Sequence, residues 1–328
     1  MPSKKLFIKP CTKPLKLLKL DAILQRLVHN HLKHGELQIE FARYSAGYRG
    51  EAALDYFLHD LDENSYLIFH DLRLPRDKEK KYYFQIDCLI VHSSFGVLLE
   101  VKNLSGDLYF DHHFDQMKRT KNGIDETFPD PVNQVQQQKS YLESWLKRNQ
   151  LPKIPLYSLV VLTNPKSFIT LSPHYGKKAA HIIRAKGLAN KVQDFSAIHQ
   201  EILSKKDLSK LTSKLLKQHE KHNPDVLKTY NIKKTDLITG VFCPDCNHVP
   251  MRRERSTWVC SRCNVKSKDA HIRAIQDYAL IFDEPVKNKT LRRFLHIDSS
   301  ICMKNLLKSM NLTPSGPTNS AKYQLPIP

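Results

Sequence analysis

The spacing of apolar residues predicts a β-hairpin near residue 90. Ile86–Val91 and Phe95–Val101 are two apolar runs rich in strand-forming residues, and a short polar segment separates them. If the connecting loop holds only two serines, Asp87 lies directly opposite Glu100. A longer loop would shift the register, so the spacing alone leaves this opposition open.

Further apolar patterns on both sides of the hairpin predict a mixture of helices and strands. Helical segments repeat their apolar residues every three or four positions, and prolines end several of them. The expected helices are Glu51–Leu61, Gln134–Arg148, His271–Phe282, Lys289–Leu295 and Asp298–Met310, with a helical pattern around Phe195–Leu216, and the expected strands are Leu156–Leu162 and Ala321–Leu325.

The N-terminal segment Lys13–Lys33 is basic and partly amphipathic. It lacks a long apolar region and a cleavage site of small residues, so we do not expect a signal peptide. The chain has no run of eighteen apolar residues, so no membrane-spanning helix is expected. We expect this segment to pack against the core around the hairpin, with binding to a membrane surface as the alternative.

The predicted hairpin carries charged residues where a buried strand disfavours them. Glu100 and Lys102 share one face of their strand, because side chains alternate. Two carboxylates opposite each other on neighbouring strands repel at about 5 Å. A divalent cation between Asp87 and Glu100 removes that penalty, and Mg²⁺ binds through one or two carboxylates while keeping sites for substrate phosphate. Lys102 is placed to hold a phosphate or orient a water. The alternative is a buried hairpin that ends in a plain salt bridge.

These residues resemble a known nuclease signature. Asp87 with Glu100-Val101-Lys102 is similar to the D…(D/E)xK motif of the restriction-endonuclease-like nucleases. The wider pattern resembles the nuclease-related domain, NERD, up to about residue 150. It comprises Gly47-Tyr48-Arg49-Gly50-Glu51, Gln85-Ile86-Asp87, Phe95-Gly96-Val97 and Glu100-Val101-Lys102-Asn103 with Gly106. The resemblance implies an α/β fold, a restriction-endonuclease-like mixed-sheet core flanked by helices. It also implies hydrolysis of phosphodiester bonds that depends on Mg²⁺ or Mn²⁺.

The resemblance carries over two further site residues. Glu51 matches a glutamate on the first core helix that joins the metal site, although a carboxylate favoured by the dipole at a helix N-terminus is the alternative. Gln134 ends a segment similar to the family's Asn-Pro-x-x-Gln element, which implies contact with a phosphate or water; a solvated polar face is the alternative. The chain departs from the family pattern at Asp130, where Asn is usual, and at Cys88, where His is common.

Four cysteines form a second constellation. Cys243 and Cys246 make one CxxC pair, and Cys260 and Cys263 make another after thirteen intervening residues. This spacing is typical of a structural zinc site in a zinc ribbon. Such a site contributes about 10 kcal/mol or more of binding free energy, enough to hold a domain with a small core. Disulfides are the alternative, and a reducing compartment favours zinc.

The C-terminal pattern of three helices and a strand predicts a winged helix-turn-helix. This tail also resembles the C-terminal part of NERD proteins that carry a zinc ribbon. In that fold Asp298–Met310 is the recognition helix. Its polar residues suited to phosphates or base edges are Ser299, Ser300, Lys304, Asn305 and Lys308. A generic three-helix interaction module fits the same pattern.

The charge of the chain favours a nucleic-acid partner. The 328 residues include 52 Lys and Arg and 33 Asp and Glu, for a formal net charge of +19. Such a charge attracts polyanions without sequence preference and with strong dependence on salt. A solubility feature and attraction to anionic lipid are the alternatives.

Together these patterns predict a cytoplasmic, DNA-processing nuclease with five segments. They are an N-terminal basic helical extension (1–42), a nuclease-like core (43–165), a helical completion and linker (166–238), a zinc ribbon (239–267) and a winged-helix-like tail (268–328). The main alternative is a non-catalytic DNA-binding or scaffold protein that keeps the nuclease fold. An RNA-binding or RNA-cleaving factor is a further one.

Overall fold

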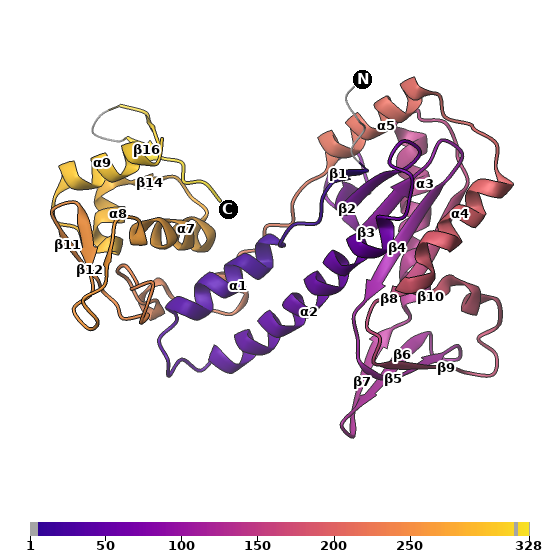
Figure 1. Ribbon diagram of the computed structural model, residues 1–328, viewed down its shortest axis with the longest axis horizontal. Helices are drawn as coiled ribbons and strands as arrows, with labels where there is room; N and C mark the ends of the chain where they lie inside the picture. Colours follow the sequence, from indigo (N-terminus) through magenta and orange to yellow (C-terminus); the bar gives the residue numbers. More distant parts are fainter. Residues whose placement is uncertain (1–5, 318–320, 328) are drawn as a thin grey trace. The chain divides into compact units, whose positions relative to one another are not determined.

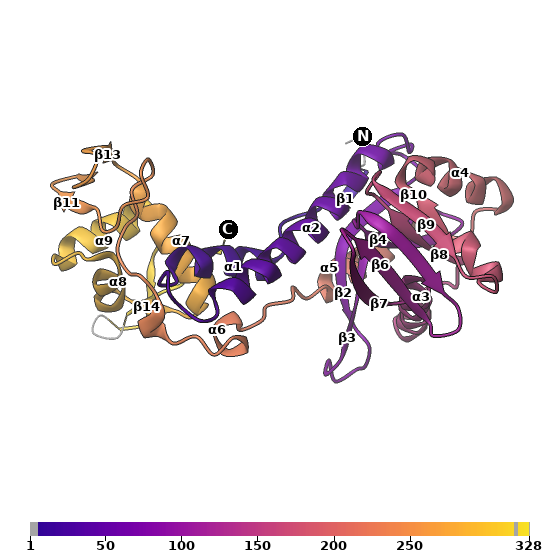
Figure 2. The same cartoon turned by 90° about the horizontal axis from the view of Figure 1, so that it is seen from below.

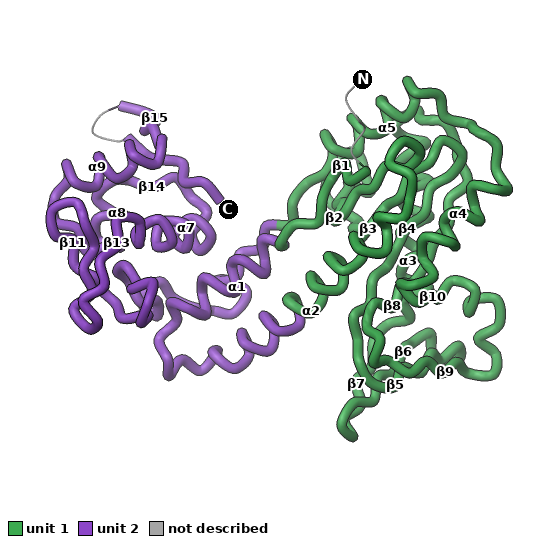
Figure 3. The backbone as a smooth tube through the Cα atoms, in the orientation of Figure 1, with its two compact units in different colours: residues 1–13, 44–222 green, residues 14–43, 223–328 purple. Residues whose placement is uncertain are grey.

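The chain divides into two compact units. The computed structural model describes residues 6–317 and 321–327. Unit 1 comprises residues 1–13 and 44–222, and unit 2 comprises residues 14–43 and 223–328 (Figure 3). The boundary near residue 43 falls inside the long helix α2 (His34–Leu58). Each unit therefore combines segments that are distant in the sequence.

A six-stranded mixed sheet forms the centre of unit 1 (Figure 1). Its strands, in spatial order, are β1 (Phe7–Lys9), β2 (Leu67–Pro75), β3 (Tyr83–Val91), β4 (Gly96–Lys102), β8 (Leu156–Leu162) and β10 (Ile182–Arg184). β2, β3 and β4 pair antiparallel, whereas β8 lies parallel to both β4 and β10. The predicted hairpin and the predicted strand Leu156–Leu162 are confirmed.

Helices cover both faces of this sheet, because neighbouring residues of a buried strand point in opposite directions. Leu98 on β4 belongs to one buried cluster with residues of α3 (Pro131–Arg148) and α5 (Lys205–Gln218). Its neighbour Leu99 belongs to a second cluster with residues of α2 and α4 (Leu188–Ile198). Figure 2 shows α3 and α4 on opposite sides of the sheet. The helical pattern around residues 195–216 is therefore two helices, α4 and α5, which cover opposite faces.

A second, four-stranded sheet completes unit 1. Its spatial order is β7 (Ile124–Pro129), β6 (Gln116–Lys121), β5 (Gly106–Asp111) and β9 (Ser167–Leu171). Leu108, Phe110 and Met117 from this sheet are buried in the cluster that also holds α3. The apolar pattern of the sequence did not predict this sheet, since its strands are largely polar and exposed.

In unit 2 the N-terminal helix α1 (Leu15–Arg26) packs against α7 (Ala270–Phe282). Arg26 is fully buried, and its Nε donates a hydrogen bond of 2.8 Å to Oδ2 of Asp277. The Arg26 guanidinium also lies 4.7 Å from the ring centroid of Phe294. The expectation that this segment packs on the core around the hairpin is therefore wrong. Its apolar face is buried within unit 2 together with the C-terminal helices.

The cysteine segment of unit 2 forms a small three-stranded antiparallel sheet. Its strands are β11 (Arg252–Glu254), β12 (Thr257–Val259) and β13 (Lys266–Ser267). Trp258 on β12 is fully buried, and its Nε1 donates a 3.2 Å hydrogen bond to Nδ1 of His271 on α7. This contact joins the cysteine segment to the helices that follow it. The short helix α6 (Val226–Thr229) precedes this segment.

Three helices and three short strands follow. The three predicted helices are confirmed as α7, α8 (Asn288–Leu295) and α9 (Ser300–Ser309). β14 (Val286–Lys287), β16 (Lys322–Tyr323) and β15 (Pro314–Ser315) make an antiparallel sheet in that spatial order. Only β16 falls within the strand expected from the sequence. None of the helices in the described residues is long and apolar enough to cross a membrane.

Candidate active site

The β3–β4 hairpin brings Asp87 and Glu100 to the same place. Cys88 pairs with Leu99 and Val91 with Gly96. One step further along this register sets Asp87 opposite Glu100, as the sequence predicted for the short loop. The paired ladder ends at Cys88, and Asp87 Oδ2 instead accepts a 2.8 Å hydrogen bond from the backbone N–H of Val101. Asp87 is thereby fixed against the end of β4.

Glu100 is the centre of a buried polar network. Only 3% of its side chain is exposed, and Oε1 lies 2.6 Å from Nζ of Lys102. Oε2 accepts a 2.9 Å hydrogen bond from Nε2 of Gln138. Nζ of Lys102 also donates to Oε1 of Gln134 at 3.3 Å. The structure therefore brings Glu100, Lys102 and Gln134 together.

Gln138 is a site residue that the sequence reasoning missed. It lies one helical turn after Gln134 on α3, so both glutamines face the end of β4. The signal was present, since residues four apart share a helix face. Gln138 is buried and Gln134 is exposed, which places Gln138 behind Glu100 and Gln134 at the solvent side.

Glu51 lies well inside a long helix. The expected helix start at this residue is wrong, because α2 begins at His34. The alternative that Glu51 is a carboxylate favoured by the dipole at a helix N-terminus is therefore also wrong. Gly50 brings this part of α2 close to the end of β4: a Cβ at Gly50 would stand 2.5 Å from Cβ of Asn103. Nδ2 of Asn103 donates a 2.9 Å hydrogen bond to the carbonyl of Ala46, which ties the helix to the strand.

Burial and repulsion from neighbouring carboxylates disfavour the ionised forms of Glu51 and Asp87. Burial, with the charges of Asp71 and Glu100, raises the pKa of Glu51 to about 7. Burial first, and then the charges of Glu100 and Glu51, raise the pKa of Asp87 well above its usual value. Burial tends to lower the pKa of Lys102, but the charge and hydrogen bond of Glu100 outweigh it and the pKa is raised. Such clustered shifts in a group of acids are characteristic of functional sites.

Asp71 and Lys9 are two further charged residues that the sequence reasoning did not single out. Asp71 on β2 has a left-handed backbone with φ of 49° and is absent from the otherwise regular pairing of β2 with β3. Its Oδ1 accepts a 2.7 Å hydrogen bond from Nε2 of Gln85, and its Oδ2 lies 3.8 Å from Nζ of Lys9. The positive charge of Lys9 therefore partly offsets the negative charge that Asp71 places near Glu51.

The two departures from the family pattern have structural explanations. Asp130 is the N-cap of α3, where its side chain accepts a 2.8 Å hydrogen bond from the N–H of Val132. It also accepts hydrogen bonds of 2.9 Å from the Tyr175 hydroxyl. Cys88 is fully buried in the cluster beneath α2. Asp130 therefore serves as a helix cap, and Cys88 is part of the hydrophobic core.

The donor set at Glu51, Asp87 and Glu100 suits a hard divalent cation, which prefers carboxylate oxygens. The charge of Glu100 contributes to the raised pKa of both Glu51 and Asp87, so the three carboxylates lie near one another. Among the described residues, however, only the four cysteines form a group of three or more donors within 4.8 Å of one another. The present side-chain positions therefore supply at most two direct carboxylate ligands, which is within the usual number for Mg²⁺.

The four cysteines are arranged as a closed metal site. Sγ of Cys243 lies 3.6 Å from that of Cys263, and Sγ of Cys246 lies 3.6 Å from that of Cys260. A tetrahedral zinc with Zn–S bonds of about 2.3 Å separates its sulfurs by about 3.8 Å. These distances exceed a disulfide bond of about 2.0 Å. The donor set and its spacing can therefore hold a structural zinc.

Comparison with known families agrees with this geometry. The family model described as "Nuclease-related domain", NERD, matches residues 46–163. The chain contains a NERD domain. The match spans Glu51, the β3–β4 hairpin and Gln134, and it ends just after β8. Comparisons with curated proteins and with solved structures find no match.

Proposed function

We propose that the NERD domain of this chain is a nuclease that hydrolyses phosphodiester bonds with the help of Mg²⁺ or Mn²⁺, with DNA as its substrate. The observation that carries the proposal is the hydrogen-bonded group of Glu100, Lys102 and Gln134 beside Asp87. One buried and one partly buried carboxylate with an adjacent ammonium are the components that metal-dependent phosphoryl chemistry needs.

Asp87 and Glu100 would hold the ion, with Glu51 as a third ligand or as a hydrogen-bond partner of its water. When bound, the ion lowers the pKa of a water and offsets negative charge on the phosphate. Hydrogen bonds from Val101 and Gln138 fix the orientation of the two carboxylates before substrate arrives. This preorganisation reduces the reorganisation that the reaction requires.

Lys102 would stabilise the negative charge that develops on the phosphate. The charge and hydrogen bond of Glu100 outweigh burial and raise the pKa of Lys102, so the amine remains protonated at neutral pH. About a quarter of its side chain is exposed, which leaves the amine accessible from the solvent side. The same amine donates a 3.3 Å hydrogen bond to Oε1 of Gln134, which is itself exposed. Gln134 would therefore position either Lys102 or the attacking water.

Unit 2 would serve as a nucleic-acid-binding module. The order α7, β14, α8, α9, β15, β16, with β16 between the other two strands, supports a winged helix-turn-helix. Zinc on the four cysteines would stabilise the ribbon against α7. A reducing compartment such as the cytoplasm would keep these thiolates available.

A cleavage assay on the intact protein tests the proposal. Plasmid, single-stranded DNA and RNA of matched length are incubated with Mg²⁺, with Mn²⁺ or with chelator. Asp87→Ala and Lys102→Ala are compared with Glu143→Gln, which removes an exposed charge on α3. We expect metal-dependent DNA cleavage by the native protein and Glu143→Gln and a loss of at least 100-fold in the other two. Cleavage that survives both substitutions contradicts the assignment.

The same assay separates the main alternative. A non-catalytic protein that keeps the fold for recognition has one observation in its favour: the three carboxylates do not gather within 4.8 Å in the described structure. It predicts binding of DNA without cleavage in either metal, and binding unchanged by Asp87→Ala.

A further inference from the structure

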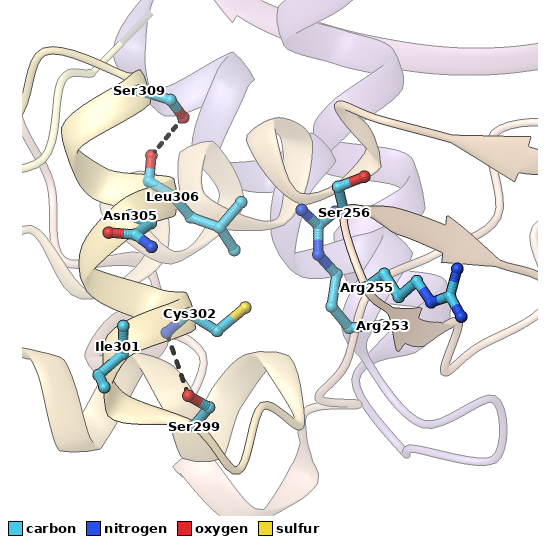
Figure 4. Close-up of a pocket in the computed structure, with 9 residues that line it drawn as sticks. All are labelled: Arg253, Arg255, Ser256, Ser299, Ile301, Cys302, Asn305, Leu306 and Ser309. Carbon is cyan, nitrogen blue, oxygen red and sulfur yellow. Dashed lines mark hydrogen bonds between the residues drawn. The ribbon is translucent and has the colours of Figure 1, made fainter.

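A cavity in unit 2 lies between the cysteine segment and helix α9. It has a volume of about 490 Å³. One wall is the turn between β11 and β12, with Arg253, Arg255 and Ser256, and the other is α9 with its cap, including Ser299 and Asn305 (Figure 4). We call it the ribbon cavity. It is separate from the carboxylates of the NERD domain, and no residue of the proposed nuclease site lines it.

The positive charge in the ribbon cavity is not neutralised by the protein. Arg253 and Arg255 have no carboxylate partner within the described part of the chain. Nε and Nη1 of Arg253 are buried and lack a hydrogen-bond acceptor. A buried guanidinium without acceptors is costly, because it loses its hydration. An anion in the cavity would reduce that cost.

The arginine is held in place by packing. The Arg253 guanidinium lies 5.2 Å from the ring centroid of Trp258, its partner across β11 and β12. Such a cation–π contact orders the side chain but supplies no hydrogen-bond acceptor in the plane of the guanidinium. Figure 4 shows this guanidinium in the space between the turn and α9, while that of Arg255 is directed away from the helix. Arg253 therefore forms the fixed part of the cavity and Arg255 its exposed rim.

Helix α9 contributes hydrogen-bond donors on the opposite wall. The Ser299 hydroxyl caps the helix by accepting from the N–H of Cys302. The first turn of α9 carries no acidic residue, so its N–H dipoles are not offset within the helix. Asn305, one turn further on, is exposed and lines the cavity. Lys304 and Lys308 on the same helix are also exposed and add positive charge.

We propose that the ribbon cavity binds a backbone phosphate of a nucleic-acid strand, held by Arg253 on one side and by Ser299 and Asn305 on the other, with Arg255 adding positive charge at the rim. A strand is favoured over a small free anion because the positive charge continues along α9 beyond the cavity. Contacts to phosphate from guanidinium groups, hydroxyls, amides and helix N-termini are those that position proteins on nucleic acid without reading its sequence. The proposal rests on the nucleic-acid-binding role of unit 2 proposed above, and it is independent of the carboxylates and of cleavage.

Fluorescence anisotropy with labelled 20-nucleotide single strands and 20-base-pair duplexes tests the site. The full chain carries Lys102→Ala to suppress cleavage, and no chelator is added, so the cysteine site stays intact. In this background Arg255→Asn removes the rim charge with a residue that tolerates the left-handed φ of 49°. Asn305→Asp puts a negative charge into the cavity. Arg262→Ala is the matched control, since Arg262 is exposed in the cysteine segment but does not line the cavity.

At 0.1 M salt we expect Arg255→Asn to weaken binding about 3- to 10-fold and Asn305→Asp by more than 10-fold, with Arg262→Ala within about 2-fold. Arg255→Asn should also reduce the slope of log K against log salt by about one. Asp298→Asn, which removes an acidic residue just before the cap, should strengthen binding. Equal losses in Arg255→Asn and Arg262→Ala would instead indicate diffuse charge and overturn the site.

The source of the phosphate is tested in the same experiment. Inorganic phosphate is added as a competitor against the labelled strand. Displacement only at tens of millimolar, where phosphate acts as ordinary salt, is the expected result. Displacement at micromolar concentrations would show that the cavity takes a small free anion, which would overturn the proposal for a strand. Zinc content and thermal melting of each variant establish that the fold is retained.

Discussion

Nε2 of Gln138 donates a 2.9 Å hydrogen bond to Oε2 of Glu100, and this bond joins α3 to the end of β4. The other oxygen of Glu100 lies 2.6 Å from Nζ of Lys102. The central carboxylate of the site is therefore oriented from two sides. The proposed chemistry depends on that orientation as well as on the residues of the motif.

Replacing Gln138 should impair the site while leaving the fold stable. Gln138→Leu removes the donor but keeps a buried side chain of similar size, so melting should shift by only a few degrees. Loss of the hydrogen bond should lower the cleavage rate or the metal affinity about 10- to 100-fold. Gln137→Leu, at the exposed neighbouring position, is the control. Equal activity in the two variants would mean that Gln138 does not position Glu100.

Lys102→Met should separate metal binding from catalysis. Its ammonium competes with a cation for Oε1 of Glu100, so its removal should raise the affinity for Mn²⁺ several-fold. The cleavage rate should fall at least 100-fold, because the ammonium that would stabilise the charge developing on the phosphate is lost. Titration calorimetry with Mn²⁺ and a single-turnover assay measure the two effects. A parallel fall in both would assign Lys102 a structural role.

The effect of Mg²⁺ on stability should depend on pH. Folding raises the pKa of Glu51 from 4.5 to about 7, mainly through burial. For an acid, a raised pKa means that the free energy of unfolding of the metal-free domain falls as pH rises from about 4.5 through 7. Mg²⁺ should offset this loss once the carboxylates ionise. Melting curves should therefore show greater stabilisation by Mg²⁺ at pH 8 than at pH 6.

Glu51→Gln is the matched variant for that pH dependence. It removes the cost of ionising Glu51, so without metal it should be more stable than the native chain at pH 8 by about 1–2 kcal/mol. At pH 5 the two should be similar. An equal response of both proteins to Mg²⁺ at pH 8 would remove Glu51 from the proposed site.

Two glycines in α2 give a matched test of how Glu51 is positioned. A Cβ at Gly50 would stand 2.5 Å from Cβ of Asn103, an atom too near its own backbone to move aside, whereas Gly47 has nothing within 4 Å. Gly50→Ala should therefore destabilise the domain by about 1–3 kcal/mol and reduce activity. Gly47→Ala should stabilise it by about 0.5–1 kcal/mol. Denaturant unfolding measures both, and similar effects would argue against the close approach.

The hairpin and its carboxylates were predictable from the sequence because their signals are local. Alternation along β3 and β4 and the short loop fix the register that sets Asp87 opposite Glu100. The CxxC spacing likewise predicted four sulfurs that lie close together. In both cases the residues that meet are near one another in the chain or carry a distinctive spacing.

The contributions from distant segments were not predictable in this way. Asp71 and Lys9 reach the site through the pairing of β1 with β2, which no local pattern specifies. Burial of α1 in unit 2 depends on the pair between Arg26 and Asp277, 251 residues apart. The helical run that contains Glu51 was assigned too late a start, since α2 already begins at His34 and includes Gly47 and Gly50. The close contact of Gly50 with Asn103 is a tertiary feature that the local pattern does not specify.

The most direct measurement of the central claim is an anomalous difference map from crystals of the native chain soaked in Mn²⁺. The account predicts one strong peak within about 2.2 Å of a carboxylate oxygen of Asp87 and of Glu100, and the loss of that peak in Asp87→Asn. The account would be contradicted if manganese bound elsewhere. In that case Asp87 and Glu100 would keep only their hydrogen bonds with Val101, Lys102 and Gln138.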